Sequence, residues 1–179
     1  MNLDRSNLEQ ILRQLADEVL ALRWTGAAPD ERVMPWLIGI RSGGAVVAQE
    51  LAAVLALTEG ERPLVGALDC SLYRDDTWLR GPRLVEGQTS LPGDPTGQRI
   101  LLVDDVLASG RTVRAAMAVL ADLGRPKAVA LAVLLDRGGR ELPIQPDAVG
   151  LRVQVEPHQS LRLLTDGHGR MERVVTQPN

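Results

Sequence analysis

Apolar residues near the start of the chain recur at intervals of three or four positions, the period of an amphipathic helix. They are Leu8, Ile11, Leu12, Leu15, Val19 and Leu22. The segment Ser6-Asn7-Leu8-Glu9 has the form of a capping box, which predicts that the helix begins beside Ser6. Pro29 and the charged residues after it predict that the helical segment has ended by that point.

Four short apolar runs follow, and each has the length of a buried strand. They span residues 36–40, 64–68, 100–103 and 128–135. Helical segments separate them. One runs to about Leu57, and another is predicted to end at Gly124 and Pro126 after burying Val113, Ala116, Met117, Leu120 and Leu123. Strands that alternate with helices predict a parallel sheet in an α/β fold.

The remaining segments are polar or irregular. Residues 73–98 are long for a structureless loop, and such loops are often functional, so a flexible lid is predicted at about 73–90. Residues 136–179 contain only short strand-like pieces and are predicted to form a small flap or hood. No repeat or linker divides the 179 residues, so residues 1–179 are predicted to form a single domain.

Charge and composition narrow the classes of function. The net charge of −3 argues against general affinity for nucleic acid, although a local basic patch stays open. No apolar run approaches the ~20 residues of a membrane span, and the N-terminus has no apolar secretory core. Cys70 is the single cysteine, so no disulfide can form within the chain. These features predict a cytoplasmic protein without a membrane partner.

Candidate chemistry gathers after the run 100–103. Asp104 and Asp105 follow that strand, and a small, hydroxyl-bearing loop then leads into a helix. Ligands of open α/β sheets bind beyond the carboxyl ends of the strands, and a helix N-terminus favours a phosphate. Carboxylates accept hydrogen bonds from ribose hydroxyls and hold Mg²⁺ directly or through water. The segment therefore predicts a phosphorylated ribose as ligand, with Asp104 and Asp105 as the candidate magnesium residues.

Residues 100–112, Ile-Leu-Leu-Val-Asp-Asp-Val-Leu-Ala-Ser-Gly-Arg-Thr, closely resemble the signature with which type I phosphoribosyltransferases bind 5-phosphoribosyl-1-pyrophosphate (PRPP). The resemblance implies the type I phosphoribosyltransferase fold, a central parallel sheet flanked by helices with a small C-terminal hood. It also implies that the acidic pair binds the ribose hydroxyls and that the following loop wraps the 5-phosphate. The substrate-binding residues implied by this signature are Asp104, Asp105, Val106, Leu107, Ala108, Ser109, Gly110, Arg111 and Thr112.

Gly39-Ile40-Arg41-Ser42-Gly43-Gly44 lies between a predicted strand and a predicted helix, and it resembles the pyrophosphate loop of the same family. By that resemblance Arg41, Ser42 and Gly43 bind the pyrophosphate of PRPP. Arg41 is then a candidate catalytic residue together with Asp104, Asp105 and Arg74.

Further segments, among them Ser71-Leu72-Tyr73-Arg74-Asp75-Asp76 and Asp136-Arg137-Gly138-Gly139-Arg140, resemble the bifunctional pyrimidine-operon regulators that are also uracil phosphoribosyltransferases. The resemblance implies PRPP, uracil and UMP as ligands, Mg²⁺ as cofactor and a homo-oligomer. It assigns Arg74 and Arg83 to the lid, and Arg137 with the backbone near Val149 to the base. Ala148 stands where the family commonly has an aromatic residue, which implies a base pocket with less stacking surface.

Two other functions stay open. One is a nucleotide-sensing attenuator that binds RNA, which the acidic balance of the first helix disfavours. The other is a purine-salvage enzyme, which is disfavoured because Ala108 stands where purine-specific relatives carry a carboxylate. Arg137 and Arg140 also have a purely structural alternative, ion pairs with Asp136 and Glu141.

Overall fold

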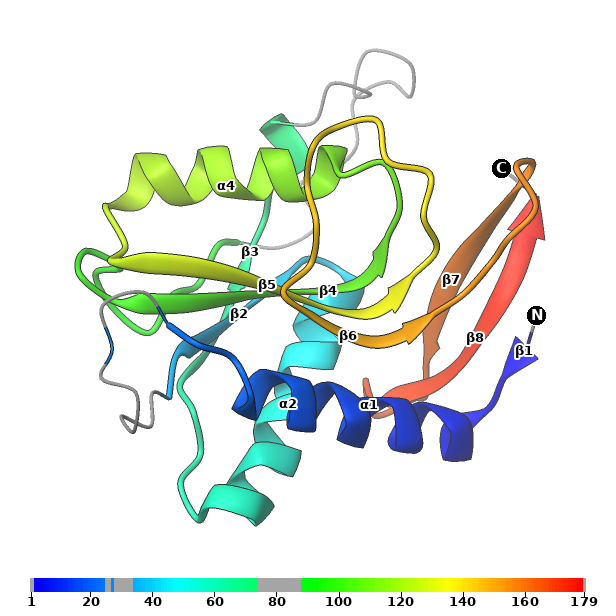
Figure 1. Cartoon of the computed structure of the whole chain (residues 1–179), viewed down its shortest axis with the longest axis horizontal. Coiled ribbons are helices and arrows are strands. Elements are labelled where there is room, and N and C mark those ends of the chain that lie inside the picture. The colour runs from blue at the N-terminus through cyan, green and yellow to red at the C-terminus, as the bar shows by residue number, and fades with distance from the viewer. Residues whose placement is uncertain (1, 25–26, 28–33, 74–87, 179) are drawn as a thin grey trace.

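Five parallel strands form the central sheet of the computed structural model (Figure 1). In spatial order they are β3 (Val65–Leu68), β2 (Trp36–Ile40), β4 (Arg99–Leu107), β5 (Ala128–Asp136) and β6 (Ala148–Arg152). The structure describes residues 2–24, 27, 34–73 and 88–178. Strands β2, β3 and β5 coincide closely with three of the apolar runs, β4 contains the fourth, and the predicted α/β architecture is confirmed.

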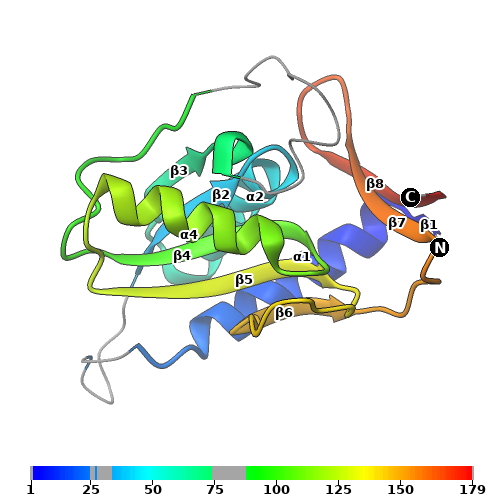
Figure 2. The ribbon, with the colours of Figure 1, turned by 90° about the horizontal axis from the view of Figure 1, so that it is seen from above.

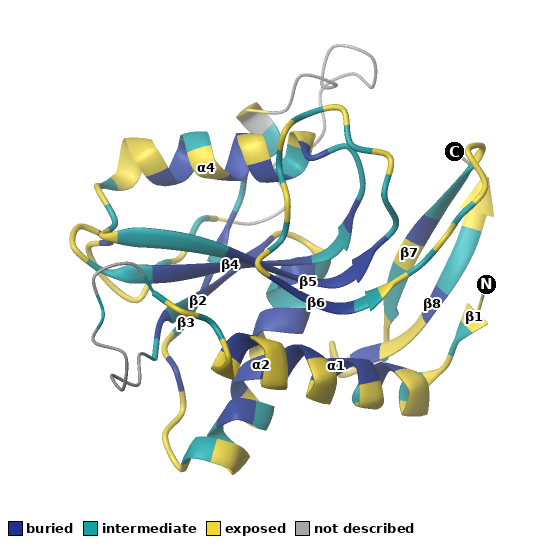
Figure 3. Ribbon diagram, in the orientation of Figure 1, coloured by how far each residue is buried: buried dark blue, intermediate teal, exposed yellow. Residues whose placement is uncertain are grey.

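Helices cover both faces of this sheet (Figures 1 and 2). Helices α1 (Arg5–Leu20) and α2 (Gly43–Glu59) pack on one face, and α4 (Arg111–Leu123) packs on the other. A short 3-10 helix, η1 (Ser71–Tyr73), lies beside α4. The strands between the two helical layers are almost wholly buried, while the outer sides of α1 and α4 are exposed (Figure 3). One apolar cluster therefore lies on each side of the sheet.

The boundaries of two elements differ from the prediction. The cap of α1 is Asp4, whose carboxylate accepts a hydrogen bond from Asn7 N at 3.0 Å while the Asn7 side chain accepts one from Asp4 N. The helix thus begins at Arg5 and Ser6 is not its cap. Strand β4 continues through Leu107, because its pairing with β5 extends beyond the apolar run. The acidic residues consequently lie within β4 and not after it.

In α4 the predicted inward face is only partly correct. Val113, Ala116 and Leu120 are buried, whereas Met117 and Leu123 are about half exposed. A 13-residue helix offers one stripe to the sheet, and these two side chains fall at its margins.

A second, three-stranded sheet is formed by β1 (Asn2–Leu3), β8 (Met171–Pro178) and β7 (Gln159–Thr165), all antiparallel. It lies to one side of the central sheet, with both ends of the described chain in or beside it (Figure 1). The segment predicted as a hood, 136–179, is thus divided. Strand β6 pairs with β5 and completes the central sheet, and only β7 and β8 belong to the separate sheet. Among the described residues, no helix is long and apolar enough to cross a membrane.

Candidate functional site

The loop that follows β4 opens α4 at the carboxyl edge of the central sheet. Gly110 caps the helix in a left-handed conformation with φ of +90°, which favours glycine there. Arg114 N donates to Gly110 O at 2.9 Å and begins the helical hydrogen bonding. Since helix N-termini carry a partial positive charge and free amide N–H groups that point out of the helix end, the loop 108–110 has the character of an anion site.

The two acidic residues of β4 face opposite sides of the sheet. Leu102 packs in the cluster beneath α4 and Val103 in the cluster beneath α2. Alternation along the strand therefore directs Asp104 toward α4 and Asp105 toward α2. A Cβ atom placed on Gly43 would lie 2.2 Å from Asp105 Oδ2, so the start of α2 rests directly against that carboxylate. The pair thus joins the two loops that the sequence singled out.

Burial affects the ionisation of one carboxyl group of this pair, that of Asp105. Asp104 is 5% exposed, and its Oδ1 accepts a hydrogen bond from Asp105 N at 3.0 Å. Desolvation raises the pKa of the Asp105 carboxyl above its ordinary value, and the hydrogen bonding around it opposes that rise only in part. A cation or a hydroxyl donor at this position would favour the ionised form.

The second loop, residues 41–44, follows β2 at the same edge. Arg41 and Ser42 are exposed, and the peptide bond between them is cis. The loop is held close to the sheet by glycines. A Cβ on Gly44 would lie 2.3 Å from Val103 O, and one on Gly39 would lie 2.4 Å from the Cα of Ala45. Only glycine permits this approach, which brings the loop beside β4.

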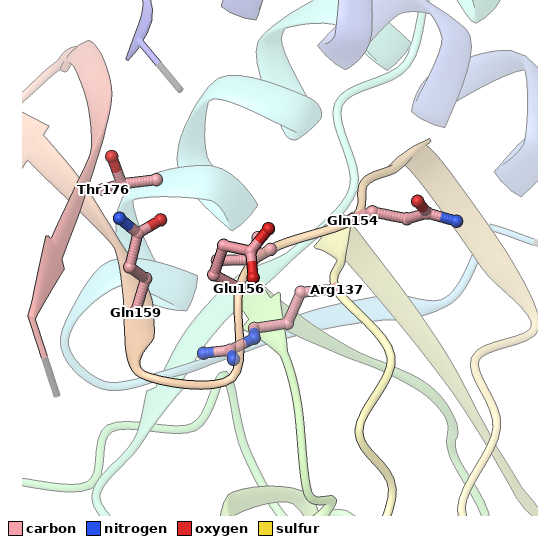
Figure 4. A pocket seen from close by; sticks show the side chains of 6 residues that line it. Arg137, Gln154, Glu156, Gln159 and Thr176 are labelled. Carbon is pink, nitrogen blue, oxygen red and sulfur yellow. The ribbon is translucent and has the colours of Figure 1, made fainter.

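A pocket of about 390 Å³ lies between the carboxyl edge of the central sheet and the antiparallel sheet. It is lined by Arg137, Gln154, Val155, Glu156, Gln159 and Thr176. The Arg137 guanidinium extends beneath Gln159 and Glu156, while the Gln154 amide points away from them (Figure 4). Arg137 N donates to Leu107 O at 3.0 Å, which fixes this residue beside the strand that carries the acidic pair.

Two residues predicted near the base are buried in β6. Ala148 is 1% exposed and packs in the cluster beneath α1, and its place beside the base stays a prediction. Val149 is buried on the α4 side and pairs with Val133. Val133 precedes Arg137 by four residues, about 13 Å along a strand. Val149 is not among the residues that line the pocket, whereas residues 154–156 are.

The sequence left open that Arg137 and Arg140 form only ion pairs with Asp136 and Glu141, and the structure shows such a pair for Arg140. Arg140 forms an ion pair with Asp136 at 2.8 Å, and Glu141 pairs with Arg111 at 2.6 Å. Sequence reasoning missed a role for Arg140, Glu141, Leu142 and Ile144, which contact the loop 108–110. Their only signal was proximity to the end of β5.

The predicted lid lies largely outside the described residues, and so do Arg74 and Arg83. Tyr73, at the start of that segment, donates its hydroxyl hydrogen to Asp122 Oδ2 in α4 at 2.5 Å. This hydrogen bond to a carboxylate raises the pKa of the Tyr73 hydroxyl.

The model of the phosphoribosyl transferase domain matches residues 3–164. The chain therefore belongs to the phosphoribosyl transferase family. Among curated relatives, the bifunctional protein PyrR of Geobacter sulfurreducens is 41% identical over 175 residues, which cover 98% of this chain and 96% of that protein. The bifunctional protein PyrR of Chloroflexus aurantiacus is 57% identical over 117 residues, 65% of this chain and 64% of that protein.

Solved structures show the same fold at low sequence identity. The hypoxanthine phosphoribosyltransferase of Trypanosoma cruzi superposes with a TM-score of 0.67 at 17% identity, covering 99% of this chain and 95% of that one. The HGPRT-ase of Leishmania tarentolae gives a TM-score of 0.62 at 18% identity, with 86% and 80% covered. The type I phosphoribosyltransferase fold predicted from the sequence is confirmed.

Proposed function

We propose that the chain transfers the phosphoribosyl group of PRPP to uracil, yielding UMP and pyrophosphate. The observation that carries the proposal is the contact between the start of α2 and the Asp105 carboxylate. Through it, a pyrophosphate-type loop, an acidic pair and a phosphate-type loop meet at one edge of the sheet. The family match and the relatives named bifunctional protein PyrR support the same reaction.

Different residues bind different parts of PRPP. The loop 108–112 holds the 5-phosphate, while Asp104 and Asp105 accept hydrogen bonds from the ribose hydroxyls. Arg41, with Ser42 and Gly43, binds the pyrophosphate, where a guanidinium fork suits phosphate oxygens. Arg74 and Arg83, outside the described residues, are proposed to close over PRPP.

Base recognition is assigned to the pocket at Arg137. Its guanidinium donates to a uracil carbonyl, and the side chains of Glu156 and Gln159 offer acceptors for a ring N–H. Residues 154–156 add polar groups to this pocket, and the backbone near Val149 stays the sequence's candidate for contact with the base.

The acidic pair also suits Mg²⁺. This ion is commonly held by one or two carboxylates with the remaining oxygens from substrate phosphates and water. Among the described residues, no group of three or more His, Cys, Asp or Glu side chains forms a metal site of its own. The pair therefore fits an ion that arrives with PRPP. When bound, Mg²⁺ neutralises charge on the pyrophosphate.

In the proposed reaction the bond from C1 of the ribose to the pyrophosphate oxygen breaks, and a bond from C1 to N1 of uracil forms. Pyrophosphate leaves with the bonding electron pair, and the N1 proton passes to solvent. Arg41 stabilises the negative charge that develops on the leaving group, which is electrostatic catalysis by a preorganised donor.

A radiolabelled base panel tests the proposal. Uracil, hypoxanthine, guanine and orotate are each incubated with PRPP and Mg²⁺, and nucleotide products are separated. We expect UMP from uracil and no product from the purines. Product from hypoxanthine in preference to uracil would overturn the assignment of the base.

A matched pair of arginine variants locates the base. Arg137→Gln should raise the uracil KM about tenfold or more, as for a lost charge-assisted bond of ~1.5–3 kcal/mol, with the PRPP KM nearly unchanged. Arg125→Gln, an exposed arginine beyond the far end of α4, should change neither constant. Equal effects from the two variants would remove Arg137 from the site.

A regulatory role on RNA is the second candidate, because the relatives are named bifunctional. The exposed side of α1 presents Arg13 against Asp17 and Glu18, a net negative charge that does not favour contact with a phosphate backbone. We expect no tight binding of pyrimidine leader RNA at ~0.15 M salt. A gel shift at nanomolar protein that UMP strengthens would place regulation beside catalysis.

A further inference from the structure

Arg140 holds three separate parts of the chain together with one guanidinium group. Its Nη1 donates to Ala108 O at 3.0 Å, its Nη2 to Asp136 Oδ2 at 2.8 Å and its Nε to Ile144 O at 2.9 Å. The side chain is only 14% exposed, and that of Asp136 only 10%. These bonds tie the end of β5 to the first carbonyl of the phosphate loop.

The neighbouring peptide groups anchor the second carbonyl of the loop. Glu141 N and Leu142 N donate to Ser109 O at 3.0 and 3.2 Å. Ile144 and Leu142 also pack against Gly110, where an added Cβ would lie 3.3 Å from Ile144 Cβ. Residues 140–144 thus form a support behind the loop, visible in Figure 1 as the yellow segment beside the start of α4.

The support determines where the loop amides point. In a planar trans peptide the carbonyl and the N–H of the next residue point in opposite directions. Because Arg140 holds Ala108 O, Ser109 N–H is directed away from residues 140–144. Because Glu141 N and Leu142 N hold Ser109 O, Gly110 N–H is directed away in the same manner. Two successive amides aimed outward form a concave donor site for an anion.

We propose that Arg140 is a positioning residue that orients the Ser109 and Gly110 amides for the 5-phosphate of PRPP. The inference rests on the proposed function, since it assumes that this loop binds that phosphate. Arg140 itself lies behind the loop and does not touch the substrate. Lysine cannot replace it, because a single ammonium group lacks the planar fork that reaches three acceptors at once.

The decisive variant removes the guanidinium without leaving a buried charge unpaired. Asp136→Asn with Arg140→Met does so, and Asp136→Asn alone is its reference, since Asn keeps the acceptor for Gly138 N. Calorimetry with Mg²⁺ then gives the Kd of PRPP and the Kd of pyrophosphate for each protein. We expect the double variant to bind PRPP at least about tenfold more weakly, a factor that corresponds to 1.4 kcal/mol, and pyrophosphate within twofold of the reference.

Arg5→Met is the matched control. Arg5 also donates to a main-chain carbonyl, that of Met171, and to two carboxylates, but it lies in α1 away from both loops. It should alter thermal stability and leave both dissociation constants unchanged. If the double variant folds poorly, Arg140→Lys should still show the selective loss of PRPP affinity. Thermal melts give the Tm of each variant, and binding is measured at a temperature below it.

The outcomes separate the two proposals. Wild-type protein that binds no PRPP would overturn the proposed function. Wild-type binding that persists unchanged in the double variant, or a loss that is equal for PRPP and pyrophosphate, would overturn the role of Arg140 and leave the function standing.

Discussion

Asp104 and Asp105 are adjacent in the chain, yet strand geometry sends their side chains to opposite faces of the sheet. Asp104 is enclosed on the α4 side, and Asp105 lies against Gly43 on the α2 side. Each carboxylate therefore lies beside a different loop. For Asp105 the ionised form is disfavoured, because burial raises the pKa of its carboxyl.

Removing the charge of Asp105 should therefore stabilise the fold and weaken the binding of PRPP. Folding raises the pKa of the Asp105 carboxyl, so at a pH above the pKa of the unfolded state this group lowers the stability of the fold. The penalty disappears as the pH falls to the point where Asp105 is protonated in the folded and in the unfolded protein. Asp105→Asn should raise Tm at neutral pH without metal, by about 2–4 °C for each 1 kcal/mol recovered, and the gain should disappear in acid. PRPP affinity should fall by ~1.5–3 kcal/mol.

Asp166 provides the control of opposite sign. Its carboxylate accepts hydrogen bonds from Arg170 N and His168 N in the β7–β8 turn, and these hold the pKa of Asp166 below its ordinary value. Asp166→Asn should lower Tm at neutral pH, with the difference shrinking as the pH falls through the folded pKa. PRPP binding should not change. A fall in Tm for Asp105→Asn at pH 7 would show that its burial is not a penalty.

The two loops have a recognisable pattern in the sequence, whereas the pocket has none. The segment 100–112 carries its chemistry in consecutive positions, so its order alone placed the acidic pair before the loop. The pocket draws Arg137, Gln159 and Thr176 from three elements, and no local pattern joins them. The burial of Ala148 beneath α1 was not predicted, because its side of β6 depends on the packing of α1, which a single apolar residue does not indicate.

At the scale of elements, long apolar runs predicted the strands well because the central strands are buried on both faces. Strand β6, Ala148–Arg152, was missed because it is short and ends at the exposed Arg152. Its place in the sheet depends on the close approach of α1. A Cβ on Gly150 would lie 2.6 Å from Ile11 Cγ2 and 2.7 Å from Leu134 O.

The contact at Gly150 predicts a steric effect on stability. Gly150→Ala should push α1 away from β6 and destabilise the protein by ~1–3 kcal/mol, as overpacking does elsewhere. Chemical denaturation should show the midpoint shifting with little change in the m-value. Gly167→Ala is the control, because nothing lies within 4 Å of the added methyl group. Similar midpoints for the two variants would mean that α1 adjusts without cost.

At the scale of the whole molecule, the small antiparallel sheet is attached to the α/β core by a polar contact as well as by its apolar face. Glu50, in α2, accepts hydrogen bonds from Met171 N at 2.6 Å and from Arg5 Nη1 at 3.1 Å. Arg5 donates in turn to Met171 O. Hydrogen bonds with Glu9 and the charge of Glu50 raise the pKa of the Arg5 guanidinium, so the group stays charged. Helix α1, helix α2 and strand β8 meet at this contact.

The contact predicts how the two sheets separate. Glu50→Ala leaves Met171 N and the Arg5 guanidinium without this acceptor, which should cost ~1–3 kcal/mol. The loss should be local: hydrogen exchange of the β7 and β8 amides should accelerate, while that of β4 and β5 should change only with global stability. Glu9→Ala is the matched control, since Glu9 shares Arg5 as partner in an exposed pair that contributes only ~0.3–0.5 kcal/mol.

Because Gln159 and Thr176 of the pocket belong to β7 and β8, Glu50→Ala should also raise the uracil KM more than the PRPP KM. Uniform acceleration in both sheets would instead show that they unfold as one unit.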